Sequence, residues 1–336
     1  MKSQSIIVAA AKRALLGPVN YMQKINLACE DPQPHVDVWL HGAGAPLLVN
    51  QCHLMACAAP LTIGVALDED RCVYAAAESD LTLEFRTHKD QRLLGEIGLS
   101  FVSSLRAGSQ GLCLFHVKSY RNLCLSPLHL WAHHQQYART YQPERNQDVP
   151  ITLREARAMI VFYLCPRPIT LVTVVEDSAA EGKRGNIFPM NLMGHLGNDL
   201  FAFALNSHRS AAPLVDRARR VVLSSVSLEH ADIVTRLGAN HRKSFIDWDD
   251  LPFATIRVDS IDAPVPSFAL HVRELHVEAA HPLGSHTLFI AKITAEHRLA
   301  EGPHFFTAHG LYNSWQHQPA LVPAQTHMHE AGNALS

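Results

Sequence analysis

The second half of the chain is organised as runs of apolar residues, each short enough for a single β-strand. The runs are "PITLVTVV" (168–175), "LFAFAL" (200–205), "RVVLSSV" (220–226), "PSFALHVRELHVEAA" (266–280) and "HTLFIAKITAEHRL" (286–299). The first is apolar on both faces and rich in β-branched residues, which is typical of a buried strand. In the fourth, the alternation changes phase around Arg273 and Glu274, as a β-bulge produces. Few helices separate the strands and no βαβ rhythm appears. The pattern therefore predicts a mainly β (α+β) protein built on an antiparallel β-barrel with a few helices rather than on a doubly wound sheet.

The first half contains a similar set of short runs between about residues 36 and 125. They are "VDVWLHG", "LLVNQCHL", "LTIGVAL", "LTLEFRT" and "GLCLFHV", separated by turn-forming segments. The stretch "DQRLLGEIGLSFVSSL" (90–105) has helical spacing, and "SPLHLWAHHQQYART" (126–140) predicts a helix with Ser126 as its N-cap. No repeat and no catalytic signature is recognisable in this half. We expect a smaller α+β module at 1–145, whose role the residues do not indicate.

The polar, proline-containing segment 140–150 is the predicted linker to the barrel, which we place at 151–318. After the linker, "TLREARAMIVFYLC" begins as a helix in which Thr152 and Glu155 occupy capping-box positions. A long, charged excursion is expected at 229–250. Its later part, "NHRKSFIDWDDLPF" (240–253), is expected to be a solvated loop, a gate for substrate or a subunit contact. Residues 319–336 contain too few apolar side chains to pack and are expected to form a loose tail.

Composition narrows the classes of function. The chain has 336 residues, of which 47% are hydrophobic and 18% charged, and a formal net charge of −2. It therefore has ample material for a core and no basic footprint for nucleic acid. No apolar run approaches the roughly 20 residues of a membrane-spanning helix. The N-terminal "SIIVAAAKRALLG" is interrupted by Lys12 and Arg13, which predicts an amphipathic helix rather than a signal peptide and favours a cytoplasmic location.

Cysteine and histidine are frequent but form no ligand pattern. The seven cysteines are irregularly spaced, and the 22 histidines include no H-E-x-x-H set. Neither a disulfide framework nor a metal site is expected, and most of the cysteines are interpreted as small buried hydrophobes.

A cluster of polar residues follows the run at 200–205, and we call residues 206–210 the polar turn. It contains Asn206, Ser207, His208, Arg209 and Ser210. Ser210 is a good N-cap for the helix expected at 211–220. The turn would then lie at the positive end of a helix dipole, with two hydroxyls, an amide and a guanidinium around it, which suits a phosphate group. The alternative is an ordinary strand-to-helix turn with a solvated arginine.

The order of these pieces resembles the flavin reductase-like family, whose fold is the FMN-binding split barrel. The resemblance covers roughly residues 160–316 and includes "PITLVTVV", the Gly-Asn segment at 185–186, the polar turn, "GSHTLFIAKI" (284–293) and "FFTAHGLYNSW" (305–315). It implies that a loop containing Asn186, Ile187 and Phe188 lines the isoalloxazine ring, and that Thr173 faces the ring or the ribityl chain. It also implies that Asn206, Ser207, Arg209 and Ser210 hold the phosphate.

Two further positions follow from the same resemblance. His286 opens the late strand where the family often has a histidine near the nicotinamide, and the alternative is a strand-end histidine at a turn. Tyr312 and His309 are either an aromatic cover over the flavin or part of the core. Ile187 to Asn191 are bulkier and more apolar than the hydroxyl-rich run that many flavin reductases carry there, which points to a different flavin environment or a reshaped substrate pocket.

The resemblance implies a flavin-dependent oxidoreductase with FMN favoured over FAD, NAD(P)H as co-substrate, and a homodimer. The leading hypothesis is an NAD(P)H-dependent FMN reductase that supplies reduced flavin to a partner monooxygenase. A second enzyme hypothesis keeps FMN bound and acts on a small organic substrate of its own. The third is a split-barrel protein that binds flavin or haem without turnover.

Overall fold

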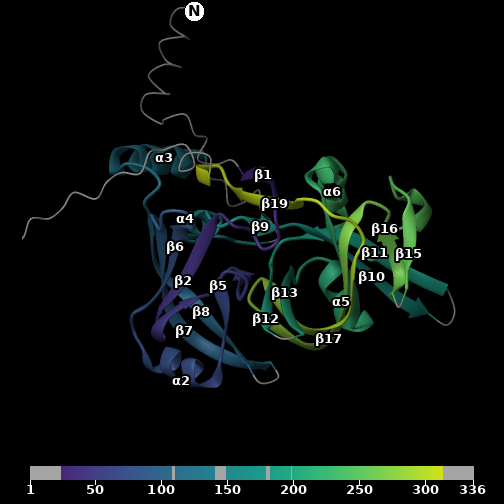
Figure 1. The fold of residues 1–336 in the computed structure, drawn as a ribbon, viewed down its shortest axis with the longest axis horizontal. Helices are drawn as coiled ribbons and strands as arrows, with labels where there is room; N and C mark the ends of the chain where they lie inside the picture. Colours follow the sequence, from purple (N-terminus) through teal and green to yellow (C-terminus); the bar gives the residue numbers. More distant parts are fainter. Residues whose placement is uncertain are drawn as a thin grey trace, which may run out of the picture.

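The computed structural model describes residues 24–107, 110–140, 149–178, 182–197, 199–259 and 261–312. Within these residues strands predominate and form two seven-stranded antiparallel sheets, which lie side by side in Figure 1. The predicted mainly β fold is therefore confirmed. The expected N-terminal amphipathic helix and the loose tail at 319–336 lie outside the described residues. No helix in the described part of the chain is long and apolar enough to cross a membrane.

The first sheet belongs to residues 36–122, and we call residues 24–140 the first module. Its strand order is β3-β2-β6-β7-β8-β5-β4. The strands are β2 (Val36–Gly42), β3 (Gly44–Leu48), β4 (His53–Ala58), β5 (Leu61–Leu67), β6 (Leu81–Thr87), β7 (Leu93–Ala107) and β8 (Gln110–Asn122), and the helices are α2 (Glu69–Ala77) and α3 (Pro127–Thr140).

The helix suggested by the spacing of residues 90–105 is wrong, because this stretch is strand β7. Two β-bulges, between Gly98 and Leu99 and between Phe101 and Ser103, interrupt its alternation. Each bulge shifts the apolar phase by one residue, and the resulting spacing imitates that of a helix.

The second sheet is built from residues 170–298, and we call residues 167–312 the second module. Its strand order is β11-β10-β14-β17-β18-β13-β12. The strands are β10 (Thr170–Ser178), β11 (Gly182–Met190), β12 (Met193–Gly197), β13 (Leu200–Asn206), β14 (Arg220–Val226), β17 (Ala269–Leu283) and β18 (His286–Arg298). The predicted bulge in the fourth apolar run is confirmed, because the β17–β18 register shifts between Glu274 and Leu275.

Smaller elements cover the second sheet and connect it to the first. They are α5 (Ala211–Ala218), η2 (Leu228–His230), α6 (Ala231–Leu237), η3 (Gly238–Arg242), η4 (Trp248–Asp250), β15 (Thr255–Val258) and β16 (Ile261–Pro266). A three-stranded sheet of β1 (Lys24–Cys29), β19 (His304–His309) and β9 (Arg167–Pro168) joins the two modules at the top of Figure 1.

Helix α4 (Leu153–Phe162) follows the linker but packs against the first sheet. Its N-terminus carries the predicted capping box, with Thr152 and Glu155 exchanging side-chain and backbone hydrogen bonds. Ile160, Val161 and Phe162 enter the core of the first module. The element that begins the expected barrel segment therefore stabilises the preceding module.

The two sheets have the same topology. Numbered along each module, both follow the order 2-1-5-6-7-4-3, and each has a helix, α2 or α5, between its fourth and fifth strands. The β-bulges also coincide. A bulge between β4 and β5 matches one between β12 and β13, and the bulge between β6 and β7 matches that between β14 and β17. The two bulges of the β7–β8 pair match those of the β17–β18 pair. The chain therefore contains a structural repeat that its sequence does not reveal.

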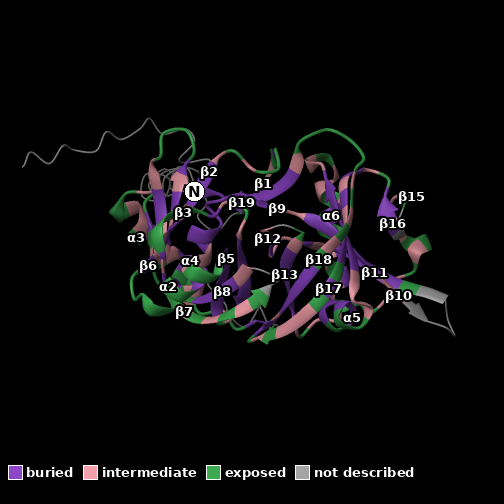
Figure 2. Cartoon of the chain, turned by 60° about the horizontal axis from the view of Figure 1, so that its bottom comes forward, coloured by how far each residue is buried: buried purple, intermediate pink, exposed green. Residues whose placement is uncertain are grey.

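Equivalent strands of the two modules pack against each other. A buried apolar cluster at this junction contains Leu54, Ala56, Ala66, Leu112 and Leu114 from β4, β5 and β8, and Leu196, Ala202, Ala204, Leu288 and Ile290 from β12, β13 and β18. Figure 2 shows buried residues running through both sheets, whereas α2 lies at the exposed rim. The junction is therefore core-like, and it uses the same face of each module.

Candidate functional site

The polar turn connects β13 to α5, as the sequence predicts. Asn206 is buried at the end of β13 and its side-chain oxygen accepts the backbone N–H of His208 (2.8 Å). Ser207 Oγ lies 3.0 Å from Thr287 Oγ1 on β18. Ser210 precedes α5, but its side chain makes no capping bond and instead donates to the Arg242 carbonyl (3.1 Å). The N-terminus of α5 therefore keeps its backbone donors uncapped by this hydroxyl.

His286 lies beside the polar turn, because it pairs with Asn206 across the β13–β18 ladder. The backbone N–H of Ala58 donates to His286 Nδ1 (3.4 Å), and Ser285 Oγ lies 2.8 Å from the same nitrogen. Burial, together with Arg209 and His208, lowers the pKa of His286 to about 4. The ring is therefore neutral at pH 7, and because Nδ1 accepts, Nε2 carries the proton.

A second histidine, His241 on η3, also borders the turn. Its Nε2 lies 2.7 Å from the Pro189 carbonyl oxygen, and its ring lies 4.7 Å from that of Phe188. Burial is the main cause that lowers its pKa to about 4, and Arg209 adds to the effect. Two neutral histidines therefore flank a permanently charged guanidinium.

The first module carries a different chemistry at the equivalent place. There, β5 is followed by Asp68, Glu69 and Asp70, and Asp68 caps α2 by accepting the backbone N–H of Arg71 (2.8 Å). Three carboxylates at a helix N-terminus repel a phosphate and one of them already occupies the backbone donors. Of these two turns, the one in the second module has hydroxyl side chains and no carboxylate.

Comparison with protein families identifies this part of the chain. The family model described as "Flavin reductase like domain" matches residues 162–314. Residues 162–314 therefore match a flavin reductase-like domain.

Three solved structures that are similar to part of the chain are flavin proteins of low sequence identity to it. An FMN-binding protein from Thermus thermophilus with bound p-hydroxybenzaldehyde is 24% identical, with 40% of this chain and 72% of that chain covered and a TM-score of 0.34. The NADH:FAD oxidoreductase SgcE6 of Streptomyces globisporus C-1027 is 15% identical over 46% of this chain and 89% of that chain, with a TM-score of 0.40. The styrene monooxygenase flavin reductase of Pseudomonas putida S12 is 18% identical over 43% and 89%, with a TM-score of 0.34. Comparison with curated proteins gives no match.

The segment expected as the ring-lining loop of the flavin reductase-like domain is a strand. Asn186, Ile187 and Phe188 lie in the middle of β11, and all three are fully buried. Segment 238–243 covers the free edge of this strand, and Asn186 Nδ2 donates to the carbonyls of Asn240 (2.9 Å) and Lys243 (2.6 Å). The sequence reasoning mistook a Gly-Asn pair within a strand for a turn signal. In this conformation the amide of Asn186 holds the covering segment.

Two other expected flavin contacts lie away from the polar turn. Thr173 is fully buried on β10 and pairs with Ile187 and Val222, and no described residue bonds to its hydroxyl. Tyr312 packs in the core of the first module, where its ring meets His35 edge-on at 5.7 Å. The structure therefore brings together Asn206, Ser207, Arg209, Ser210 and His286, and it does not bring Thr173 or Tyr312 to them.

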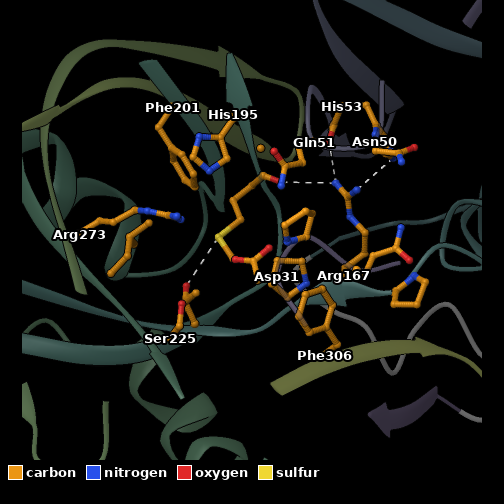
Figure 3. Close-up of a pocket in the computed structure, with 18 residues that line it drawn as sticks. Asp31, Asn50, Gln51, His53, Arg167, His195, Phe201, Ser225, Arg273 and Phe306 are labelled. Atoms are coloured by element: carbon orange, nitrogen blue, oxygen red, sulfur yellow. Dashed lines mark hydrogen bonds between the residues drawn. The ribbon is translucent and has the colours of Figure 1, made fainter. Parts of the chain in front are cut away.

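A cavity of about 70 Å³ lies between the modules, and we call it the junction pocket. It is at the end of the second sheet opposite the polar turn, because Phe201 lines it near the start of β13, whereas Asn206 ends that strand. The residues around it come from the loops at 31–33 and 50–51, from the start of β4, and from β9, β10, β12, β13, β14, β17 and β19 (Figure 3). The sequence reasoning missed this site, and its one local signal was an arginine, Arg167, at the start of a buried apolar strand.

Metal ligation is not a feature of the described residues. No group of three or more His, Cys, Asp or Glu side chains among them is arranged to hold a metal ion. The seven cysteines are all free thiols.

Proposed function

We propose that the chain is a flavin-dependent oxidoreductase whose single flavin is held by the polar turn of the second module. The observation that carries the proposal is the turn itself, in which a strand end, an uncapped helix N-terminus and Arg209 meet within a flavin reductase-like domain. The residues fit a flavin phosphate: the turn supplies hydroxyl and guanidinium donors, and residues 206–210 include no carboxylate.

The specific activity that we propose is NAD(P)H-dependent reduction of FMN, with delivery of reduced flavin to a partner monooxygenase. A bound flavin supplies the hydride chemistry, and the protein supplies binding and orientation. Ser207, Arg209 and Ser210 hold the phosphate in this proposal. His286 offers its protonated Nε2 as a hydrogen-bond donor on the nicotinamide or substrate side, and its low pKa keeps it neutral throughout the physiological range.

The proposal is tested by titrating the flavin-free protein with FMN and following the quenching of flavin fluorescence. Arg209→Ala is expected to weaken FMN binding by about 1.5–3 kcal/mol, the range for a hydrogen bond to a charged group. The matched control is Arg217→Ala, because Arg217 lies on α5, the helix that follows the polar turn, and pairs with Glu176 (3.1 Å). The control should bind FMN like the parent. Equal affinity in the Arg209 variant and the parent would remove the phosphate from this turn.

A second candidate, an oxidoreductase that keeps FMN bound and acts on its own small organic substrate, is favoured by the packing of the first module. The β4–β5 turn contacts His286 through Ala58, and Leu61 at the start of β5 donates to Glu155 of α4 (3.0 Å). The second module is therefore not open on this side. Flavin that remains with the protein through purification supports this candidate, whereas flavin that dissociates supports the reductase. A Soret band in place of flavin absorption would instead support a haem-binding protein.

The homodimer implied by the family resemblance stays a prediction. Within one chain the first module already covers β12, β13 and β18 of the second. A second chain would have to use another surface.

A further inference from the structure

The repeat allows one module to be compared with the other, position by position, at the end of the sheet that forms the junction pocket. Register pairs match four pocket positions of the second module to four of the first: Thr170 to Val38, His195 to Met55, Ser225 to Phe85 and Arg273 to Ile97. Every residue of the first module in this set is apolar and fully buried. Every residue of the second is polar and lines the pocket.

The first module also fills this end with an aromatic side chain. Phe162 of α4 packs edge-on against Phe85, with ring centroids 6.4 Å apart. The second module has serine at the position equivalent to Phe85, and the described residues leave a cavity there. The same fold is therefore closed and apolar in one copy, and open and polar in the other.

Arg167 gives the junction pocket its charge. The residue is 4% exposed, yet no described carboxylate forms an ion pair with it. Its Nη1 lies 3.0 Å from His53 Nε2, and its Nη2 donates to the carbonyls of His53 (2.7 Å) and Met193 (3.4 Å). The guanidinium carbon lies 4.8 Å from the centre of the Phe162 ring, and Nε has no partner among the described residues. These neutral acceptors and the aromatic ring compensate the buried charge only in part, because none of them is an anion.

The neighbours of Arg167 do not supply that anion. His53 Nδ1 lies 2.6 Å from the Val49 carbonyl and therefore carries the ring proton, and His53 is neutral because burial and Arg167 hold its pKa well below the usual range. Burial raises the pKa of the Cys165 thiol to about 11, so this group is also neutral. Asp31 lines the pocket but is exposed to solvent, and Arg273, which enters from the side opposite Arg167 in Figure 3, pairs with Glu296 (2.6 Å).

We propose that the junction pocket binds the carboxylate of a short-chain organic acid, with Arg167 as its counter-charge. A guanidinium binds a carboxylate through paired N–H donors. Beside its polar residues the pocket has an apolar part of its wall, made by Phe201, Phe306, Leu223 and three prolines. This apolar part matches the short hydrocarbon group of an organic acid, which a phosphate ion lacks. The cavity of about 70 Å³ holds roughly five water-sized groups, which limits the ligand to an acid of the size of acetate, propionate or pyruvate.

The site is independent of the flavin proposal, so its test uses the flavin-free full-length protein. Thermal unfolding is followed at pH 7 and at constant ionic strength, with sodium acetate, propionate or pyruvate exchanged for sodium chloride. A ligand that binds only the folded state raises Tm with a saturable dependence on concentration. Sodium phosphate provides the inorganic comparison.

Two variants and one control locate the effect. Arg167→Gln removes the counter-charge and is expected to weaken binding of the organic acid roughly tenfold or more, as for a charge-assisted hydrogen bond. Ser225→Phe leaves Arg167 in place and puts the residue of the first module into the pocket, so it should abolish binding by filling the space. Arg121→Gln removes an exposed arginine of the first module that pairs with Glu96 (3.3 Å), and it should change nothing.

The proposal is supported if a carboxylate stabilises the parent in a saturable way and Ser225→Phe loses this response. It is overturned if no carboxylate acts beyond the chloride reference, or if Ser225→Phe responds like the parent. Stronger stabilisation by phosphate than by every organic acid contradicts the assigned class of ligand. Because Ser225→Phe keeps every charge in the pocket, the test remains decisive even if Arg167→Gln fails to fold.

Discussion

The junction cluster predicts that the two modules unfold as one unit, and the repeat supplies a matched pair of substitutions to test this. Leu112 on β8 and Leu288 on β18 occupy equivalent positions, opposite Ala66 and Ala204 respectively, and both are fully buried. Because alanine has a small side chain, the leucine of each pair fills most of the space between the two sheets. Leu→Ala at either position therefore opens a cavity between two sheets that cannot easily collapse. Buried Leu→Ala substitutions cost about 2–5 kcal/mol. That is a large fraction of the roughly 5–15 kcal/mol that stabilises a typical domain.

The measurement is urea unfolding followed by tryptophan fluorescence and circular dichroism, combined with hydrogen exchange read separately for peptides of each module. Both Leu112→Ala and Leu288→Ala should lower the free energy of unfolding by a similar amount and accelerate exchange in both modules. Leu128→Ala on α3 is the control, because Leu128 is 62% exposed and surface changes usually stay within about 0.5 kcal/mol. Two separate transitions, with each substitution shifting only the transition of its own module, would refute the reasoning.

Three further outcomes are expected. Lowering the pH from 7.5 towards 4 should destabilise the fold, because His241 and His286 have folded pKa values of about 4 against 6.5 for the unfolded ring. The contribution of these two histidines to the free energy of unfolding is complete above pH 6.5 and is lost as the pH falls through 4. His286→Gln should therefore reduce the pH dependence of the free energy of unfolding measured in urea. An unchanged dependence would argue against the burial of His286. Asn186→Ala should lower the free energy of unfolding by about 1–3 kcal/mol, because two carbonyls of segment 238–243 lose their hydrogen-bond donor. An unchanged free energy of unfolding in urea would show that the Asn186 side chain does not hold this segment in place. His286→Ala should slow flavin reduction or raise KM in rapid-mixing assays while FMN content stays intact. If this variant instead lost its flavin but had normal kinetics at saturating FMN, the proposed role of His286 would be wrong.

The parts of the fold that sequence could predict are those encoded over a few consecutive residues. The strand at 168–175 is marked by an unbroken β-branched run, and the phase change at Glu274 marks a bulge that the structure contains. The capping box at Thr152 and the turn after Asn206 are equally local. Longer strands with two bulges, such as β7, defeat the same reasoning because their apolar spacing no longer has a period of two.

The repeat and the junction pocket could not be predicted, for a different physical reason. Equivalent positions such as Phe85 and Ser225 have unlike residues, because one packs a core and the other lines a cavity. What the modules share is strand order and register, which depend on backbone pairing rather than on side-chain identity. The pocket residues extend from Asp31 to Phe306, and only tertiary packing brings them together.

We propose that the second module alone holds a flavin, because its polar turn offers donors where the first module presents Asp68, Glu69 and Asp70. Equilibrium titration of the flavin-free protein with FMN tests it most directly, with absorbance and fluorescence giving the stoichiometry. We predict saturation at one FMN per chain, with a full complement still bound by Asp68→Ala and weaker binding by Arg209→Ala. Absence of FMN binding, or saturation at two FMN per chain, would contradict the account.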